Sequence, residues 1–226
     1  LFTQPDKPVG RKQLLTPPHI KQYCLDENLN IPIFQPLKLR NNEEATKQIE
    51  ELKPDFIIVA AYGQILPKEI LDIAPCINLH ASLLPKYRGA SPIQESLIND
   101  DKFIGVTSML MEEGLDSGDI LALQYLKITP TMEVSEKFKK LSLIAAKLTL
   151  TTLDNYEKIK PQKQNEAEVS FCKKIKKDDG LVNFFDAKNL YLKYKAYSYW
   201  PGVFLESELK LKDIELIETT SSNEKG

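Results

Sequence analysis

One apolar segment limits the possible folds more than any other feature of the sequence. Residues 55 to 62, DFIIVAAY, are almost continuously hydrophobic, as is typical of a parallel strand covered on both faces. Before it lie a helical pattern from Pro17 to Asn28, a short strand from Ile31 to Phe34, and a second helical pattern that Asn42 can cap. An apolar strand from Cys76 to His80 comes after it. Strands that alternate with helices predict an α/β fold built on a mainly parallel sheet.

The alternation continues in the next part of the chain. A helix from Ser91 to Asn99 precedes two strands, from Phe103 to Met111 and from Ile120 to Ile128. Because only the short segment EEGLDSGD joins these strands, we expect them to pair antiparallel at one edge of the sheet. Apolar residues at helical spacing then predict a long helix from about Glu133 to Ile159. We therefore assign residues 1–159 to one domain.

The composition changes after this helix. Residues 160–180 are rich in lysine and other polar side chains, which predicts a basic linker. A helix over 187–197 and two alternating segments, WPGVFLE and LKLKDIELIE, follow. A domain this small with two strands is incomplete, so we expect residues 181–226 to begin a second, small domain.

Charge and cysteine usage exclude several classes of function. The net charge of -2 gives no general preference for polyanions, so a nucleic-acid site would need a local basic patch. Cys24, Cys76 and Cys172 are odd in number and lack the spacing of a metal site, which favours a reducing compartment such as the cytoplasm. No apolar stretch approaches the roughly 18 residues that a membrane helix needs. We therefore expect neither a metal nor a membrane partner.

Two hydrogen-bonding side chains lie at the end of the strand from Cys76 to His80. Side chains alternate along a strand, so Asn78 and His80 face the same way. Open α/β sheets bind their ligands at the carboxyl ends of their strands. A functional site is one interpretation of this pair. The other is a core histidine that bonds to a neighbouring backbone group.

Two loops strengthen the first interpretation. The SLLP segment places apolar residues in a connection that is usually polar, which is typical of a pocket wall for a flat organic molecule or of a buried loop. The loop EEGLDSGD holds Asp116 where it could reach His80. A carboxylate beside a histidine fixes its tautomer and stabilises its protonated form. An aspartate in a glycine-rich turn can also simply form the turn.

The segments INLHASLLPKYRGASPIQESLI and MEEGLDSGDIL resemble the folate-dependent formyltransferase family. The resemblance extends from residue 1 to about residue 205 and implies a Rossmann-like formyl-transfer domain followed by a small β-barrel domain of OB type. It implies that Asn78, His80 and Asp116 are catalytic, that 10-formyltetrahydrofolate is the formyl donor, and that no metal is needed. The residues expected to contact the folate are those of the SLLP segment, Ser82, Leu83, Leu84 and Pro85.

These implied roles fit the chemistry of formyl transfer. An amine that attacks a formyl carbonyl produces an oxyanion, to which the Asn78 amide and a protonated His80 could donate. Each such donor typically lowers the barrier by about 3 kcal/mol. Asp116 would keep His80 charged and help to move the amine proton.

Two other segments, LFTQPDKPVGR and AYGQILP, are similar to the branch of the family whose acceptor is initiator methionyl-tRNA. The resemblance implies that the loop over residues 4–13 enters the acceptor-stem end of that tRNA. Arg11 matches its key arginine, with Lys7 and Lys12 beside it. The lysines of the linker are suited to neutralising phosphates. We expect a single chain to be the acting unit.

Two other functions remain open. One is a formyltransferase that acts on an amino-sugar nucleotide or on glycinamide ribonucleotide, and the other is a non-catalytic α/β module that binds RNA. The resemblance also implies a strand, a glycine-containing loop and a helix ahead of Leu1, and the rest of the barrel beyond Gly226. We therefore expect the sequence to be part of a longer protein.

Overall fold

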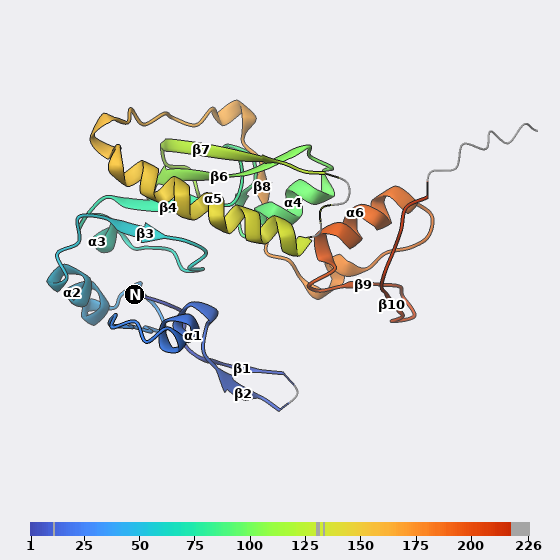
Figure 1. The fold of residues 1–226 in the computed structure, drawn as a ribbon, viewed down its shortest axis with the longest axis horizontal. Helices are drawn as coiled ribbons and strands as arrows, with labels where there is room; N and C mark the ends of the chain where they lie inside the picture. Colours follow the sequence, from blue (N-terminus) through green and yellow to red (C-terminus); the bar gives the residue numbers. More distant parts are fainter. Residues whose placement is uncertain (11, 130–131, 133, 218–226) are drawn as a thin grey trace, which may run out of the picture. The chain divides into compact units, whose positions relative to one another are not determined.

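The chain, drawn as a ribbon in Figure 1, divides into two compact units. The computed structural model describes residues 1–10, 12–129, 132 and 134–217. The first unit contains Leu1–Asn78 and Leu110–Gly114, and the second contains Leu79–Met109 and Leu115–Gly226.

The first unit begins with an antiparallel hairpin and continues with alternating helices and strands. Its elements are β1 (Lys7–Val9), β2 (Leu14–Thr16), α1 (His19–Asp26), α2 (Glu43–Glu51), β3 (Ile57–Val59) and α3 (Lys68–Leu71), followed by β4 (Cys76–His80), which runs on into the second unit. The predicted cap of α2 is confirmed, because Asn42 Oδ1 accepts a hydrogen bond from the Ala45 amide at 3.0 Å. The core of the unit is a buried cluster: Leu39, Ala45, Ile49, Leu66, Ile70 and Cys76.

Two predicted strands of this unit are shorter than expected. The apolar run over 55–62 forms a strand only at Ile57–Val59, and it is not covered on both faces, because Ile58 is 40% exposed and lines an apolar cavity. The predicted strand from Ile31 to Phe34 is reduced to a bridge between Phe2 and Phe34. Pro32 has no amide hydrogen with which to extend that pairing.

The second unit carries the remaining elements. They are β5 (Arg88–Gly89), α4 (Pro92–Ile98), β6 (Phe103–Leu110), β7 (Ile120–Lys127), α5 (Val134–Asp154), β8 (Phe171–Cys172), α6 (Ala187–Tyr197), β9 (Val203–Phe204) and β10 (Lys210–Leu211), with 3₁₀ turns at Tyr156–Lys158, Glu166–Glu168 and Lys177–Gly180. Helix α5, yellow in Figure 1, packs against β7, and α4 packs against α6. The predicted long helix therefore ends at Asp154, and a 3₁₀ turn replaces its last part.

The main sheet is mixed. Its strand order is β3-β4-β6-β7, with β3 and β4 parallel and β6 and β7 antiparallel. The antiparallel pairing of the last two strands is as predicted. The parallel pair β3–β4 and the antiparallel pair β6–β7 together make the sheet a mixed one.

The segment after α5 is held by backbone pairing. Gln162 and Ile120 exchange two hydrogen bonds, from the Gln162 amide at 2.9 Å and from the Ile120 amide at 2.8 Å. Strand β8 then pairs parallel with β5. Among the described residues beyond 200, β9 and β10 form one two-stranded sheet, so an OB-type barrel stays a prediction.

Candidate active site

His80 is the last residue of β4 and is buried, with 6% of its side chain exposed. Its Nε2 lies 2.8 Å from the backbone oxygen of Tyr87. A carbonyl oxygen can only accept, so Nε2 carries the hydrogen and donates it. The phenol of Tyr87 donates to Asp101 Oδ2 at 2.7 Å, and burial raises the pKa of that phenol above its usual range. Tyr87, whose carbonyl fixes His80, is thus itself fixed by the hydrogen bond from its phenol to Asp101.

Asp116 lies on the opposite side of the imidazole. Its Oδ2 accepts from the Gly89 amide at 2.9 Å and is 3.6 Å from His80 Nδ1, within ion-pair range but longer than a hydrogen bond. The Asp116 backbone has a φ of +47°, a left-handed conformation that Asp tolerates better than most residues. The structure therefore brings together the strand-end histidine and the loop carboxylate that the sequence pointed to. It also gives His80 the backbone bond of the alternative interpretation.

Asn78 precedes His80 by two residues on β4. It is partly buried and lies in register with Val59 of the parallel neighbour β3. The alternation along β4 gives Asn78 and His80 the same face of the strand. The catalytic roles of these residues remain predictions.

The SLLP loop is pinned to β6 by a buried threonine that sequence reasoning missed. Thr107 Oγ1 donates to the Ser82 carbonyl at 2.7 Å and accepts from the Leu84 amide at 3.1 Å. Ser82 Oγ in turn donates to the Lys86 carbonyl at 2.6 Å. A hydroxyl inside the apolar strand FIGVTSML was the available signal, because a buried hydroxyl needs partners.

The four predicted folate contacts therefore differ in exposure. Ser82 and Leu84 are buried at 1% and 4% exposure and hold the loop. Leu83 and Pro85 are partly exposed. The Leu83 side chain packs where Gly105 has no Cβ, since a Cβ there would lie 2.4 Å from Leu83 Cδ2. Leu83 and Pro85 are thus the two apolar side chains that a ligand could reach.

A buried polar cluster, also missed, lies behind the Asp116 loop. Arg88 is 4% exposed, and its Nε donates to Gln164 Oε1 at 3.0 Å. Gln164 Nε2 donates to the Asp116 and Gly118 carbonyls at 2.9 and 2.8 Å. Arg88 also pairs with Glu166 at 2.8 Å. Gln164 belongs to the predicted linker, and nothing in its local sequence indicated these partners.

The predicted tRNA loop forms the β1–β2 hairpin of the first unit. Lys7 and Lys12 are exposed, and Arg11 lies outside the described residues. Lys21 and Gln35 both donate to Asp6 at the base of the hairpin, at 2.9 and 2.7 Å. The hydrogen bond from Gln35 and then that from Lys21 hold the pKa of Asp6 below its usual value. The hairpin therefore projects from a fixed base.

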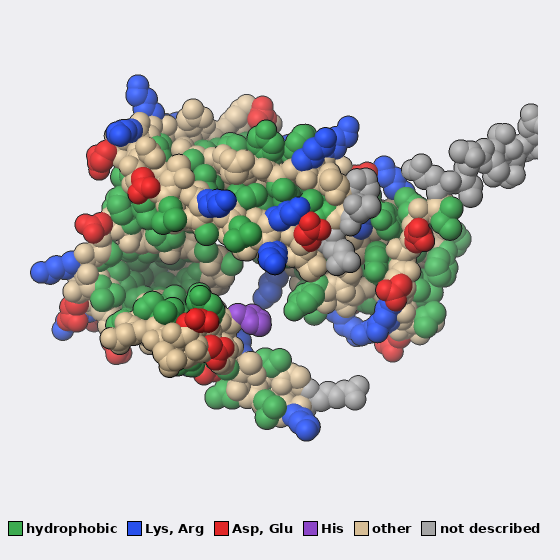
Figure 2. Space-filling view, in the orientation of Figure 1, with side chains coloured by type: hydrophobic (Ala, Val, Ile, Leu, Met, Phe, Trp, Pro, Cys, Tyr) green, Lys and Arg blue, Asp and Glu red, His purple; other side chains and the backbone are tan. Residues whose placement is uncertain are grey.

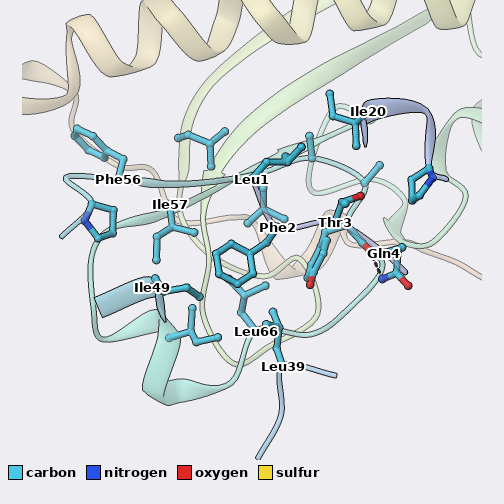
Figure 3. Close-up of a pocket in the computed structure, with 18 of the residues that line it drawn as sticks. Leu1, Phe2, Thr3, Gln4, Ile20, Leu39, Ile49, Phe56, Ile57 and Leu66 are labelled. Carbon is cyan, nitrogen blue, oxygen red and sulfur yellow. Dashed lines mark hydrogen bonds between the residues drawn. The ribbon is translucent and has the colours of Figure 1, made fainter. Parts of the chain in front are cut away.

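An apolar cavity of about 670 Å³ lies elsewhere, in the first unit (Figure 3). Leu1, Phe2, Ile49, Ile57 and Leu66 are among the side chains that line it, and none of the predicted site residues does. Its lining contains no Asp, Glu, Lys or Arg. The residues predicted to catalyse formyl transfer, Asn78, His80 and Asp116, therefore lie outside this cavity.

Surface charge and metal ligands add little to the site. Figure 2 shows lysine and arginine side chains spread between acidic and apolar ones on the visible face. Within the described part of the chain, no group of three or more His, Cys, Asp and Glu side chains could hold a metal ion. No described helix combines the length and apolar character needed to cross a membrane.

Comparisons with known proteins are consistent across sequence and structure. Residues 1–152 match the family model described as formyl transferase. A methionyl-tRNA formyltransferase of a Nitratiruptor species is 57% identical over 226 residues, which make up 100% of this chain and 74% of that protein.

Two solved structures share the fold. A methionyl-tRNA formyltransferase from Clostridium thermocellum matches with a TM-score of 0.62 and 21% identity, over 82% of this chain and 81% of that one. HypX from Aquifex aeolicus, in complex with tetrahydrofolic acid, matches with a TM-score of 0.64 and 21% identity, over 81% of this chain and 32% of that one. At 21% identity, these two matches show only that the fold is shared.

Proposed function

The chain belongs to the family of methionyl-tRNA formyltransferases, and on this premise we propose that it transfers a formyl group from 10-formyltetrahydrofolate to the α-amine of initiator methionyl-tRNA. The product is formyl-methionyl-tRNA for translation initiation. The observation that carries the proposal is the approach of Asp116 Oδ2 to His80 Nδ1, 3.6 Å apart, within a sequence that is similar along its whole length to such enzymes.

The proposed chemistry begins with the neutral amine, which attacks the formyl carbon and gives a tetrahedral intermediate with a negatively charged oxygen. The bond from that carbon to the folate nitrogen breaks when this intermediate collapses. The Asn78 amide and His80 donate hydrogen bonds to the formyl oxygen as it gains negative charge. His80 can do this only through Nδ1, because its Nε2 hydrogen is donated to the Tyr87 carbonyl, which fixes the ring, whereas Asp116 Oδ2 lies 3.6 Å from Nδ1, too far for a hydrogen bond. Asp116 supports a second proton on Nδ1 and helps the amine proton to leave, to be returned to the folate nitrogen.

The folate donor supplies the formyl carbonyl, and we propose that Leu83 and Pro85 contact its ring system. Both side chains are apolar and partly exposed, at the end of a loop that Thr107 holds rigid. Ser82 and Leu84 then act indirectly, by fixing that loop. HypX, solved with tetrahydrofolic acid, supports a folate site in this fold.

We further propose that the β1–β2 hairpin, with Lys7, Arg11 and Lys12, contacts the acceptor end of the tRNA. The exposure of Lys7 and Lys12 and the fixed base at Asp6 support this role. The basic segment over 160–180 would add contacts to phosphates, and residues 181–226 would begin an OB-like domain. We expect one chain to act alone in the cytoplasm.

The test combines the full protein with 10-formyltetrahydrofolate and charged initiator tRNA and measures formyl-methionine. Parallel reactions offer an amino-sugar nucleotide and glycinamide ribonucleotide as acceptors. Formylation of the tRNA alone, lost in Asn78→Ala and weakened in an Arg11→Glu variant, is the expected result. Formylation of a small acceptor without the tRNA would contradict the proposal, as would full activity of Asn78→Ala.

A further inference from the structure

The loop that carries Asp116 adopts a conformation that its own sequence does not enforce. Asp116 has a φ of +47°, in the left-handed region, which costs a non-glycine residue free energy relative to the ordinary helical region. A loop with such a residue keeps its shape only if neighbouring groups hold it. Gln164 supplies two bonds of this kind, one to the carbonyl of Asp116 and one to the carbonyl of Gly118, so it spans the turn on both sides of Ser117.

The amide of Gln164 makes three of the four hydrogen bonds of which it is capable, two of them to the Asp116 loop. Both Nε2 hydrogens go to loop carbonyls, and Oε1 accepts from Arg88 Nε at 3.0 Å. Carbonyls only accept and Arg88 only donates, so the partners allow a single orientation of the amide. Gln164 is 8% exposed and Arg88 is 4% exposed, so both side chains are buried and each depends mainly on partners within the protein.

Gln164 and Arg88 are each connected to Asp116, the first through the Asp116 backbone and the second through the residue that follows it in the chain. Arg88 is followed by Gly89, whose amide donates to Asp116 Oδ2 at 2.9 Å. Gln164 therefore ties the backbone of the Asp116 loop to the strand that also binds the Asp116 side chain. Gln164 is itself fixed two residues earlier, where Gln162 exchanges two backbone bonds with Ile120 of β7.

We propose that Gln164 is a positioning residue for formyl transfer, which keeps the Asp116 carboxylate between the Gly89 amide and His80 Nδ1. The inference rests on the proposed function for the role of Asp116. Without the Gln164 amide, the loop relaxes from its left-handed conformation and the carboxylate moves away from the imidazole.

The first test compares Gln164→Ala and the similarly sized Gln164→Met with Glu166→Gln in the full chain. The last variant removes the exposed carboxylate on the far side of Arg88 and leaves the Gln164 bonds in place. We expect both Gln164 variants to lower kcat about 10- to 100-fold, the effect of a small misplacement of a reacting group, with KM for tRNA and donor little changed. Glu166→Gln should cost much less, because the glutamine keeps an oxygen that can accept from Arg88 and the bonds of Gln164 stay in place.

A second kinetic test separates positioning from a general structural role. If Gln164 acts through Asp116, Gln164→Ala should cost little more in an Asp116→Asn background, because coupled sites are not additive. An equal loss of kcat in both backgrounds would overturn the proposal. If Gln164→Ala fails to fold, Gln164→Met carries the same cycle.

The last test needs no activity. Hydrogen exchange of the Gly89 amide reports its bond to the Asp116 carboxylate, and we expect both Gln164 variants to exchange it faster than the wild type and Glu166→Gln do. Unchanged protection of Gly89 in the Gln164 variants would overturn the inference even if the enzyme is active. A wild type that formylates no tRNA would instead refute the proposed function, and the exchange result would stand by itself.

Discussion

The two ring nitrogens of His80 have partners of different strength and kind. Nε2 donates to a neutral backbone oxygen at 2.8 Å, whereas Nδ1 faces a carboxylate at 3.6 Å. The first contact fixes the orientation of the ring and does not depend on charge. The second is sensitive to the charge of Asp116, so a substitution that keeps the shape of that side chain isolates its electrostatic role.

Asp116→Asn should lower kcat by about 10²- to 10⁴-fold, the usual range for loss of acid–base support. Asparagine tolerates positive φ as well as aspartate does, so the fold should persist. The control is Asp100→Asn, which makes the same change at an exposed residue that also has a positive φ, of 54°. Steady-state kinetics of both variants would decide, and equal activities would contradict the role of Asp116.

Lys137 is a second residue whose charge matters, for stability rather than catalysis. Its side chain is fully buried and donates to the Met132 carbonyl. Burial, followed by repulsion from Lys195, lowers the pKa of Lys137 to about 8, while Glu136 opposes the shift. Between pH 8 and the unfolded value of roughly 10.4 the unfolded chain binds the extra proton, so the contribution of Lys137 to stability rises with pH in this window.

Lys137→Met should remove that rise and, below pH 8, should stabilise the protein by about 1–3 kcal/mol, because no buried ammonium is left to desolvate. Urea unfolding at pH 7, 8, 9 and 10 is the measurement. Lys139→Met, at an exposed neighbouring position of α5, should leave the pH dependence as it is in the wild type. A Lys137→Met curve parallel to the wild-type curve would refute the assignment.

At the level of elements, β6 holds the SLLP loop through one of two adjacent hydroxyls. Thr107 and Ser108 are both fully buried. Thr107 Oγ1 has two partners in the loop, whereas Ser108 Oγ has no hydrogen-bond partner among the residues that the structure describes. Neighbouring residues of one strand therefore offer a matched comparison.

Thr107→Val should destabilise the protein by about 1–3 kcal/mol and raise KM for the folate donor, because it leaves the Ser82 carbonyl and the Leu84 amide unpaired in the interior. Ser108→Ala should be neutral or stabilising, since it removes a hydroxyl that has no such partner. Chemical unfolding and donor titration would measure both effects. Equal destabilisation by the two changes would show that Thr107 does not fix the loop.

Elements with a strong local pattern could be predicted from the sequence, and those defined by distant partners could not. The strand Cys76–His80 and the helix Ala187–Tyr197 agree with prediction residue by residue. The β1–β2 hairpin was expected only as a loop, because the residues of both strands are exposed and the apolar Leu14 and Leu15 are adjacent rather than alternating. Its sequence therefore lacks the period of a half-buried strand.

The candidate site divides in the same way. His80 ends one strand and Asp116 lies in the loop after another. Ligand sites in open α/β sheets lie at the carboxyl ends of strands, so the sequence could predict both residues. Gln164 and Arg88 lie 76 positions apart, and no local pattern around either residue indicates their contact. Folding brings Gln164 of the predicted linker against Arg88 and the Asp116 loop. The composition of the linker cannot predict a contact between residues so far apart in the sequence.

For the molecule as a whole, the three cysteines provide a probe of integrity. Cys24, Cys76 and Cys172 are free and buried. Burial raises the pKa of Cys76 to about 11 and also raises the pKa of Cys172. Because the thiolate is the reactive form, both access and ionisation oppose modification in the native state.

Native protein at pH 8 should therefore react with a thiol reagent far more slowly than protein in concentrated urea. Cys24 and Cys76 report on the first unit, and Cys172 reports on the second. Mass spectrometry of partly labelled protein would assign each rate. A Ser142→Cys variant, exposed on α5, should gain one rapidly labelled thiol, and rapid native labelling of any of the three natural cysteines would contradict their burial.

The pairing of β5 with β8 has a consequence for protein synthesis. Ser170 and Cys172 bond to residues 87–90, yet they leave the ribosome some 83 positions after Tyr87. A nascent chain that stalls before residue 164 already contains Asn78, His80 and Asp116, but it lacks the segment that holds their loops. Truncated translation products are thus expected to be inert, even though they carry every residue assigned to the reaction itself.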